Sequence, residues 1–151
     1  MIKLPKHVKT GLFWALRLGL GGLFLYAGAA KIGAPADFAT EIANYQLGNT
    51  LAPLMAVTMP AVEIVLGMAL IAGTRPWVRA AALGSAGLLA VFTVAVTTVV
   101  ARGINVDCGC FGGNAGPVTM VTVLRDVLLL AGAAGIFLLS AQLPVSTPSE
   151  A

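Results

Sequence analysis

Four long runs of apolar residues dominate the chain, and shorter polar segments separate them. The runs cover about residues 12–30, 54–73, 79–101 and 120–141. A transmembrane α-helix needs about 20 consecutive apolar residues, so each run is long enough to cross a bilayer. The pattern predicts an all-α integral membrane protein, a bundle of four transmembrane helices forming one domain over residues 1–142. A cleaved signal peptide is the alternative interpretation of the first run, because basic residues precede it.

The segment between the first two runs, residues 31–53, is too polar to span a membrane. Within it Phe38, Ile42 and Tyr45 recur at helical spacing. This spacing favours a short helix over residues 36–47 that lies on the membrane surface or caps the bundle, with an ordinary loop as the alternative. The last segment, 143–151, reads LPVSTPSEA and is expected to be a disordered tail.

Small residues recur inside the apolar runs. They include Gly19, Gly22, Gly84, Gly87 and Gly135. Because small residues let two helix backbones approach closely in a membrane, we expect a compact bundle.

The composition supports a lipid environment. Hydrophobic residues make up 58% of the chain and charged residues only 10%, whereas soluble domains carry about 25% charged residues. The four spans leave no room for a separate soluble enzyme domain. The net charge of +3 comes from basic residues scattered singly between apolar runs, so nucleic acid is not an expected partner.

The basic residues predict the orientation of the helices. Four spans place both termini on one side, and cytoplasmic loops carry an excess of lysine and arginine. Lys31 and Arg102 lie on the side opposite the termini, and the termini share their side with Lys3, Lys6, Lys9, Arg75 and Arg79. We therefore expect a multi-pass protein of the cell membrane with cytoplasmic termini and an extracytoplasmic segment before the fourth span.

Both cysteines of the chain, Cys108 and Cys110, lie in that segment, in the sequence VDCGCFGG. Disulfides form and persist outside the cytoplasm, and strained, exposed disulfides are the labile or catalytic ones. A Cys-Gly-Cys disulfide closes a very small ring, whereas a structural crosslink stabilises most when it closes a long loop. The spacing favours a redox pair, with the adjacent Asp107 as a candidate for proton transfer.

A structural disulfide and a copper(I) site are the alternatives for the cysteine pair. Further metal ligands are lacking, because the single histidine, His7, lies on the cytoplasmic side and no methionine cluster flanks the loop. We therefore expect no metal. A relay of dithiols across the membrane needs at least two pairs, so electrons must pass to a bound quinone or to a protein that docks beside the chain.

Charged residues inside the apolar runs are the second candidate site. Glu63 lies near the middle of the second run, where an ionisable residue is costly unless it is paired or functional. Arg17 enters the first run from the cytoplasmic end, about 8 Å from Glu63 in depth. We expect a structural pair between Arg17 and Glu63, with a proton-handling or ligand-binding role for Glu63 as the alternative. Arg125 and Asp126 lie near the start of the fourth run, where two charges can snorkel or pair at a lower cost than at the midplane.

Several stretches of the chain resemble a known family, the membrane proteins called MauE and DoxX, and more closely its MauE-like branch. The matching stretches are RLGLGGLFLYAGAAKI, FATEIANYQL, PAVEIVLGMALI and RGINVDCGCFGG, which together cover about residues 13–140. CGCFG preceded by a basic residue and an aspartate is the most specific of these features. The chain is also similar to relatives of vitamin K epoxide reductase, which carry Cys-x-x-Cys where this chain has Cys-x-Cys.

The resemblance implies a four-helix membrane protein linked to thiol redox chemistry. MauE-like proteins are linked to maturation of the methylamine dehydrogenase small subunit beside a thioredoxin-like partner, and DoxX relatives to quinone-coupled oxidation. Carried onto this chain, the resemblance implies Cys108 and Cys110 as the redox pair. It also implies four recurrent polar positions inside the membrane: Arg17, Lys31, Glu63 and Arg125.

We therefore predict a membrane thiol-disulfide redox protein, and the candidate enzyme activity is that of a quinone-linked thiol-disulfide oxidoreductase. Cys108 and Cys110 would exchange electrons with an extracytoplasmic thioredoxin-like protein or a maturing client. A quinone would bind in a crevice near Glu63 and Arg125, supported by four polar side chains: Arg17, Lys31, Asp107 and Asp126. One rival is a non-catalytic assembly factor for a disulfide-rich enzyme, and the other is a small proton-coupled transporter that uses Glu63.

Overall fold

The computed structural model describes residues 5–46, 50, 52–104, 106 and 116–142. Four of its helices are long and apolar enough to cross a membrane: α1 (Lys6–Gly33), α3 (Ala52–Ala72), α4 (Arg75–Ala101) and α5 (Met120–Gln142). A short helix, α2 (Pro35–Asn44), lies between the first two of them. The predicted fold class, a multi-pass bundle with four spans and a short intervening helix, is confirmed. The predicted tail, 143–151, lies outside the described residues.

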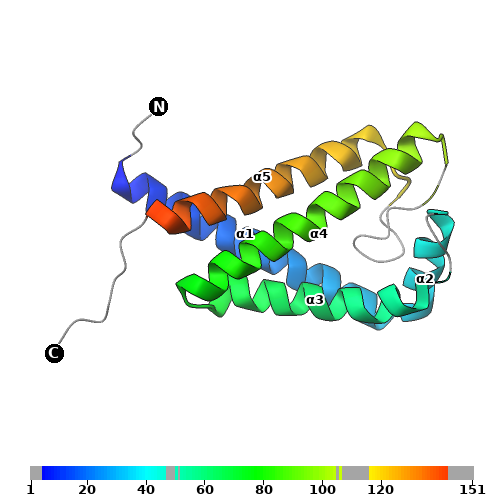
Figure 1. The fold of residues 1–151 in the computed structure, drawn as a ribbon, viewed down its shortest axis with the longest axis horizontal. Helices are drawn as coiled ribbons and strands as arrows, with labels where there is room; N and C mark the ends of the chain where they lie inside the picture. Colours follow the sequence, from blue (N-terminus) through cyan, green and yellow to red (C-terminus); the bar gives the residue numbers. More distant parts are fainter. Residues whose placement is uncertain (1–4, 47–49, 51, 105, 107–115, 143–151) are drawn as a thin grey trace.

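The long helices run side by side in an elongated bundle (Figure 1). α1 packs mainly against α3, and α4 packs mainly against α5. The start of α1, the end of α5 and the α3–α4 connection lie at one end of the bundle (Figure 1). α2, the end of α4 and the start of α5 lie at the opposite end, which we call the α2 end. The functional site described below lies towards this end.

Large apolar side chains cover the outside of the bundle. Val65 of α3, Val94 of α4 and Leu128 of α5 are each more than 60% exposed. Helices satisfy their backbone hydrogen bonds internally, so such a surface is stable against lipid. The interior holds a separate apolar cluster that includes Leu70, Ala82 and Ile136.

The short helix α2 caps the bundle. Pro35 occupies its first turn, a position where the missing backbone N–H is not needed. Phe38 points inward and is 4% exposed, and Tyr45, just after the helix, is also buried. Ile42 is half-buried. The helical spacing of these three residues therefore marks the face that packs on the bundle.

The closest approach between helices occurs where glycines of α1 meet α3. A Cβ atom on Gly28 would lie 2.9 Å from the carbonyl oxygen of Pro60, and one on Gly67 would lie 2.8 Å from that of Gly21. The expected close packing of helices occurs at these glycines, which were not among those named in the sequence analysis. Of the glycines named from the sequence, Gly84 and Gly135 contact other helices, whereas space within 4 Å is open at Gly19, Gly22 and Gly87.

We predict that Gly28→Ala separates α1 from α3, because the added methyl group meets a backbone oxygen that cannot move aside alone. Overpacking of this kind costs about 1–3 kcal/mol of the free energy of unfolding. The matched control is Gly22→Ala on the same helix, where the space is open. Unfolding of both variants in mild detergent checks this, and equal stability of the two would contradict it.

Candidate functional site

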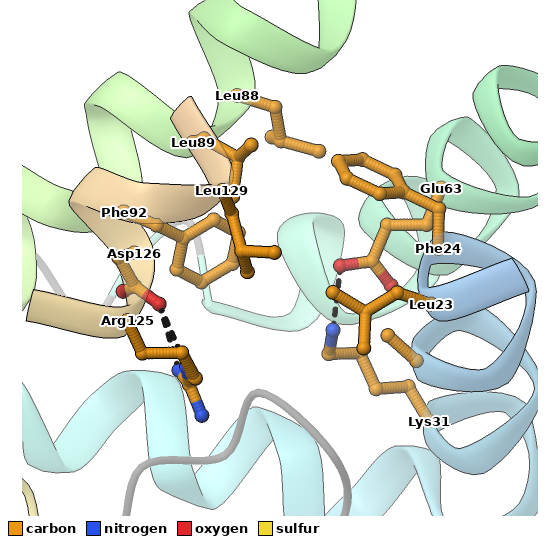
Figure 2. Close-up of a pocket in the computed structure, with 11 residues that line it drawn as sticks. Leu23, Phe24, Lys31, Glu63, Leu88, Leu89, Phe92, Arg125, Asp126 and Leu129 are labelled. Carbon is orange, nitrogen blue, oxygen red and sulfur yellow. Dashed lines mark hydrogen bonds and ion pairs between the residues drawn. The ribbon is translucent and has the colours of Figure 1, made fainter. Parts of the chain in front are cut away.

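Four helices surround a small cavity that contains most of the charged residues found inside the bundle. Its volume is about 40 Å³. α1 contributes Lys31, α3 contributes Glu63, and α5 contributes Arg125 and Asp126 (Figure 2). The remaining lining is apolar: Leu23, Phe24 and Ala27 of α1, Leu88, Leu89 and Phe92 of α4, and Leu129 of α5. The bundle thus gathers four charges from three helices around one space.

Lys31 and Glu63 form a buried ion pair beside this cavity. The Lys31 Nζ atom donates to Glu63 Oε1 over 2.5 Å, and the two residues are 2% and 5% exposed. The same ammonium group lies 5.1 Å from the ring of Phe38 and 5.8 Å from that of Phe92. Aromatic ring faces attract cations, so the two rings stabilise the charge further. The pair is thus held by side chains from α1, α2, α3 and α4.

The expectation that Lys31 lies in an outer loop is wrong. α1 continues to Gly33, one turn beyond the apolar run, so Lys31 is still helical and points into the bundle. Its long apolar stem lets the ammonium group reach Glu63 from the last turn of α1. Lys31 therefore does not count among the basic loop residues from which the orientation of the helices in the membrane was predicted.

The expected pair between Arg17 and Glu63 is also wrong. Arg17 donates through Nε to the carbonyl oxygen of Leu70, and through Nη2 to those of Ile71 at 3.0 Å and Gly73 at 2.6 Å. These carbonyls belong to the end of α3, where the last turn of a helix leaves its acceptors without partners. Leu70 lies seven residues beyond Glu63, or about 10 Å along the helix.

Arg17 therefore stabilises the end of α3 and takes no part in the cavity. Its guanidinium group also lies over the ring of Trp14, 4.7 Å from the centroid. A cation at a helix C-terminus is favourable for the helix dipole as well. This structural role accounts for a buried arginine in a membrane span, and no catalytic or ligand-binding role is needed to explain it.

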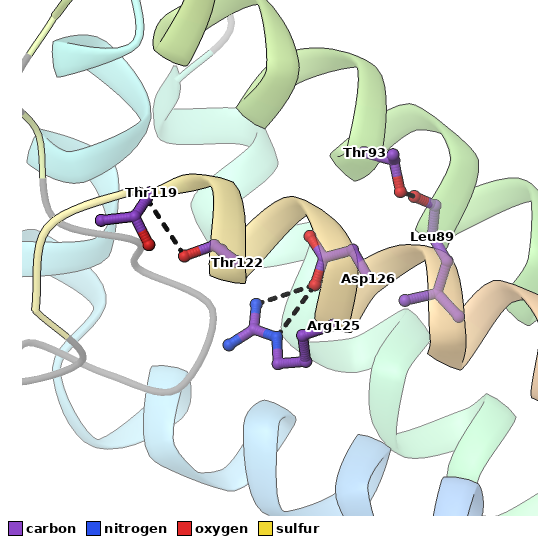
Figure 3. Close-up of polar contacts among 6 residues, drawn as sticks. All are labelled: Leu89, Thr93, Thr119, Thr122, Arg125 and Asp126. Atoms are coloured by element: carbon purple, nitrogen blue, oxygen red, sulfur yellow. Dashed lines mark hydrogen bonds and ion pairs between the residues drawn. The ribbon is translucent and has the colours of Figure 1, made fainter.

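Arg125 and Asp126 form the second ion pair at the cavity. Both Nε and Nη2 of Arg125 donate to the same oxygen, Asp126 Oδ1, at 3.0 and 2.8 Å (Figure 3). The side chain of Asp126 is 3% exposed, whereas that of Arg125 is 33% exposed. The pair lies in the second turn of α5, and the backbone N–H of Thr119 donates to Thr122 Oγ1 just before it (Figure 3). Sequence analysis left snorkelling and pairing open for these two residues, and the structure shows that they pair.

One oxygen of each carboxylate lacks a partner. Among the described residues, Glu63 Oε2 and Asp126 Oδ2 are buried and accept no hydrogen bond. Buried polar atoms are nearly always hydrogen-bonded, so an atom without a partner calls for an explanation. Both residues line the cavity.

The chain on either side of the cysteine segment is held at the α2 end. The backbone N–H of Val118 donates to the carbonyl oxygen of Val106 over 2.9 Å. Both valines pack on a cluster formed by Tyr45, Val96 and Val99. Cys108, Cys110 and Asp107 themselves lie outside the described residues.

The cavity is too small for a quinone ring. A cavity of about 150 Å³ accommodates benzene, whereas this one measures about 40 Å³. Glu63 and Arg125 do line the same space, as a shared crevice requires. The residues present do not fit a quinone head group in this arrangement of the helices, and we derive no step through one.

Phe38 and Phe92 were missed by sequence analysis as parts of this site. Phe38 was assigned to the capping helix only, and Phe92 lies in a run without any charge. The available signal was Lys31, because a lysine just after an apolar run can still point inward and then needs a carboxylate and aromatic rings around it.

Comparison with known proteins points to one family. The family model described as methylamine utilisation protein MauE matches residues 9–139. Methylamine utilization protein MauE of Paracoccus denitrificans is 34% identical over 146 residues, which cover 95% of this chain and 76% of that protein. No solved structure matches the chain.

We predict that Lys31→Met destabilises the bundle strongly, because it leaves the Glu63 carboxylate buried without its cation. Removing one partner of a buried ion pair costs about 3–5 kcal/mol, whereas replacing both partners by apolar residues is often neutral. The double variant Lys31→Met/Glu63→Leu should therefore recover most of the lost stability. Denaturant unfolding in detergent measures both effects.

Lys9→Met is the control for this prediction, because Lys9 lies near the start of α1, is only half-buried, and donates to the exposed Gln142 rather than to a buried carboxylate. Surface substitutions of this kind change stability by about 0.5 kcal/mol or less. A double variant no more stable than Lys31→Met would show that the two side chains do not stabilise each other.

Proposed function

The chain belongs to the MauE family of methylamine utilisation proteins, and from this premise we propose that it is a membrane thiol-disulfide exchange protein. Cys108 and Cys110 would take electrons from a maturing extracytoplasmic client and pass them to a thioredoxin-like partner. The observation that carries the proposal is the hydrogen bond between Val106 and Val118. It joins the residues on either side of the segment that contains both cysteines, at the α2 end.

Covalent geometry limits how far the cysteines extend from this anchor. Cys108 follows Val106 by two residues, and Cys110 follows it by four. An extended chain spans at most about 3.6 Å per residue, so we propose that the two cysteines react at the α2 end. A partner that reacts with them must approach that end of the bundle.

The proposed exchange needs no reactant beyond two thiol proteins. A client thiolate attacks one sulfur of the Cys108–Cys110 disulfide, and the other cysteine leaves as a thiolate. The second client thiol then attacks the mixed disulfide, so the client is oxidised and the pair is reduced. The reduced pair transfers its two electrons and two protons to the disulfide of the thioredoxin-like partner. The pair returns to the oxidised form, and atoms and electrons balance.

We propose that the α2 end faces away from the cytoplasm. Lys31 is buried and Arg125 lies within α5, so Arg102 is the basic residue of the described connections on the α2 side, and its Nη2 donates to Gln46 Oε1. Four basic residues of the described chain lie towards the opposite end, Lys6, Lys9, Arg75 and Arg79, and Lys3 precedes them in the sequence. The positive-inside rule then places the termini in the cytoplasm and the cysteines in an oxidising compartment, where a disulfide persists.

The link to methylamine metabolism rests on the descriptions of the relatives alone. The family and the Paracoccus protein are both described as methylamine utilisation proteins. We propose accordingly that the client of this chain is an extracytoplasmic enzyme of that process. A role in assembly without redox chemistry is the rival that the experiment below separates.

The test replaces one cysteine at a time in the full chain. Cys108→Ser or Cys110→Ser leaves one thiol that cannot resolve a mixed disulfide, so we expect at least one of these variants to retain a covalent partner. The trapped species is detected on non-reducing gels of membranes from cells quenched with acid. Labelling of intact cells by a membrane-impermeant maleimide should reach the remaining thiol.

The control is the double variant, Cys108→Ser/Cys110→Ser, which should trap nothing. The proposal fails if neither single variant forms a mixed disulfide, or if client maturation proceeds normally in the double variant. The second of these outcomes favours the non-catalytic assembly factor.

A further inference from the structure

Two buried carboxylate oxygens face the interior of the bundle without a partner. Glu63 Oε1 and Asp126 Oδ1 each take part in an ion pair. Within the part of the chain that the structure describes, Glu63 Oε2 and Asp126 Oδ2 accept no hydrogen bond. The two residues are 5% and 2% exposed, so bulk water does not satisfy these atoms. Leaving a buried acceptor unsatisfied costs about 1–3 kcal/mol, and more when it is charged.

Both residues line the same cavity of about 40 Å³, on opposite sides of it (Figure 2). A water molecule needs about 10–15 Å³ of such volume and two to four polar partners. The cavity therefore has room for about two to four waters, and it offers polar atoms of Lys31, Glu63, Arg125 and Asp126 as partners. A larger organic ligand does not fit.

The charges around the cavity argue against a cation as its occupant. α1 presents Lys31, α3 presents Glu63, and α5 presents Arg125 and Asp126. α4 presents only apolar residues to the cavity: Leu88, Leu89 and Phe92. The formal charges cancel, so an added metal ion would be repelled by two cations, whereas neutral water both donates to the carboxylates and accepts from the cations.

We propose that this cavity is a hydrated proton-transfer site that links Glu63 to Asp126. Its waters hydrogen-bond to Glu63 Oε2 and Asp126 Oδ2 and join the two ion pairs in one network. When one carboxyl group is protonated, it gives its proton to a water, which passes a proton on to the other carboxylate. One O–H bond breaks and one forms at each transfer, and the total charge is unchanged.

Radiolytic hydroxyl-radical labelling tests whether the cavity holds water, because the radicals arise from water next to the labelled side chain. The experiment uses the full chain in lipid nanodiscs. Leu129 and Leu130 are neighbours on α5, and both are half-buried and pack against the apolar core, but of the two only Leu129 lines the cavity. We expect Leu129 to be oxidised several-fold faster than Leu130. Equal rates would overturn the proposal.

Infrared titration tests whether a proton is shared. Glu63→Gln and Asp126→Asn identify the carboxyl band of each residue. If the two groups are coupled through the cavity, Asp126→Asn should move the pH midpoint of the Glu63 band by about one pH unit or more. Asp37→Asn is the control, because Asp37 is an exposed carboxylate on α2 that does not line the cavity.

An unchanged Glu63 midpoint in Asp126→Asn would overturn the proton-transfer role. If that variant does not fold, the labelling of the unsubstituted chain still decides whether water is present. Neither readout needs the cysteines, so both are run in the Cys108→Ser/Cys110→Ser background. Failure here is therefore distinct from failure of the thiol exchange proposal.

Discussion

The buried ion pair between Lys31 and Glu63 is the interaction on which the arrangement of the bundle depends. A bilayer offers no water to a charge, so each of the two side chains requires the other. Their contact sets how α1 is rotated against α3, and the rings of Phe38 and Phe92 around the ammonium group bring α2 and α4 to the same point. α5 completes the enclosure with a second pair, Arg125 and Asp126. One polar centre thus connects all five helices of the described chain.

Much of the fold could be predicted from hydrophobic runs, because segment length and polarity alone decide which parts of a chain cross a bilayer. Which residues the charged side chains of α1 and α3 would contact could not be predicted in this way. Depth along a span says nothing about helix rotation, so Arg17 was assigned to Glu63 although it donates to backbone carbonyls at the end of α3. Every residue carries a backbone carbonyl, so a sequence does not show which carbonyl oxygens will accept from an arginine. Lys31 was misplaced for a simpler reason, since helix ends predicted from hydropathy stop where the apolar run stops.

The two candidate sites, the cysteine pair and the cavity, differ in what they require. Thiol exchange needs accessible sulfur atoms and a partner protein, and the contact between Val106 and Val118 holds the ends of that segment on the bundle. The internal cavity needs enclosure and charge balance, and it is too small for a ring. Oxidation of a dithiol releases protons, so a proton site inside the bundle is chemically compatible with the proposed exchange. Each site is nevertheless argued from its own residues.

The reduction potential of the Cys108–Cys110 pair tests the central claim most directly. Structural disulfides have potentials below about −300 mV, whereas exchange-active pairs lie above that value. Purified chain in nanodiscs is equilibrated with glutathione buffers of defined ratio, and the free thiols are counted by mass after alkylation. A reversible transition above about −300 mV is the result we expect. A pair that stays oxidised throughout, or never forms the disulfide, would contradict the account.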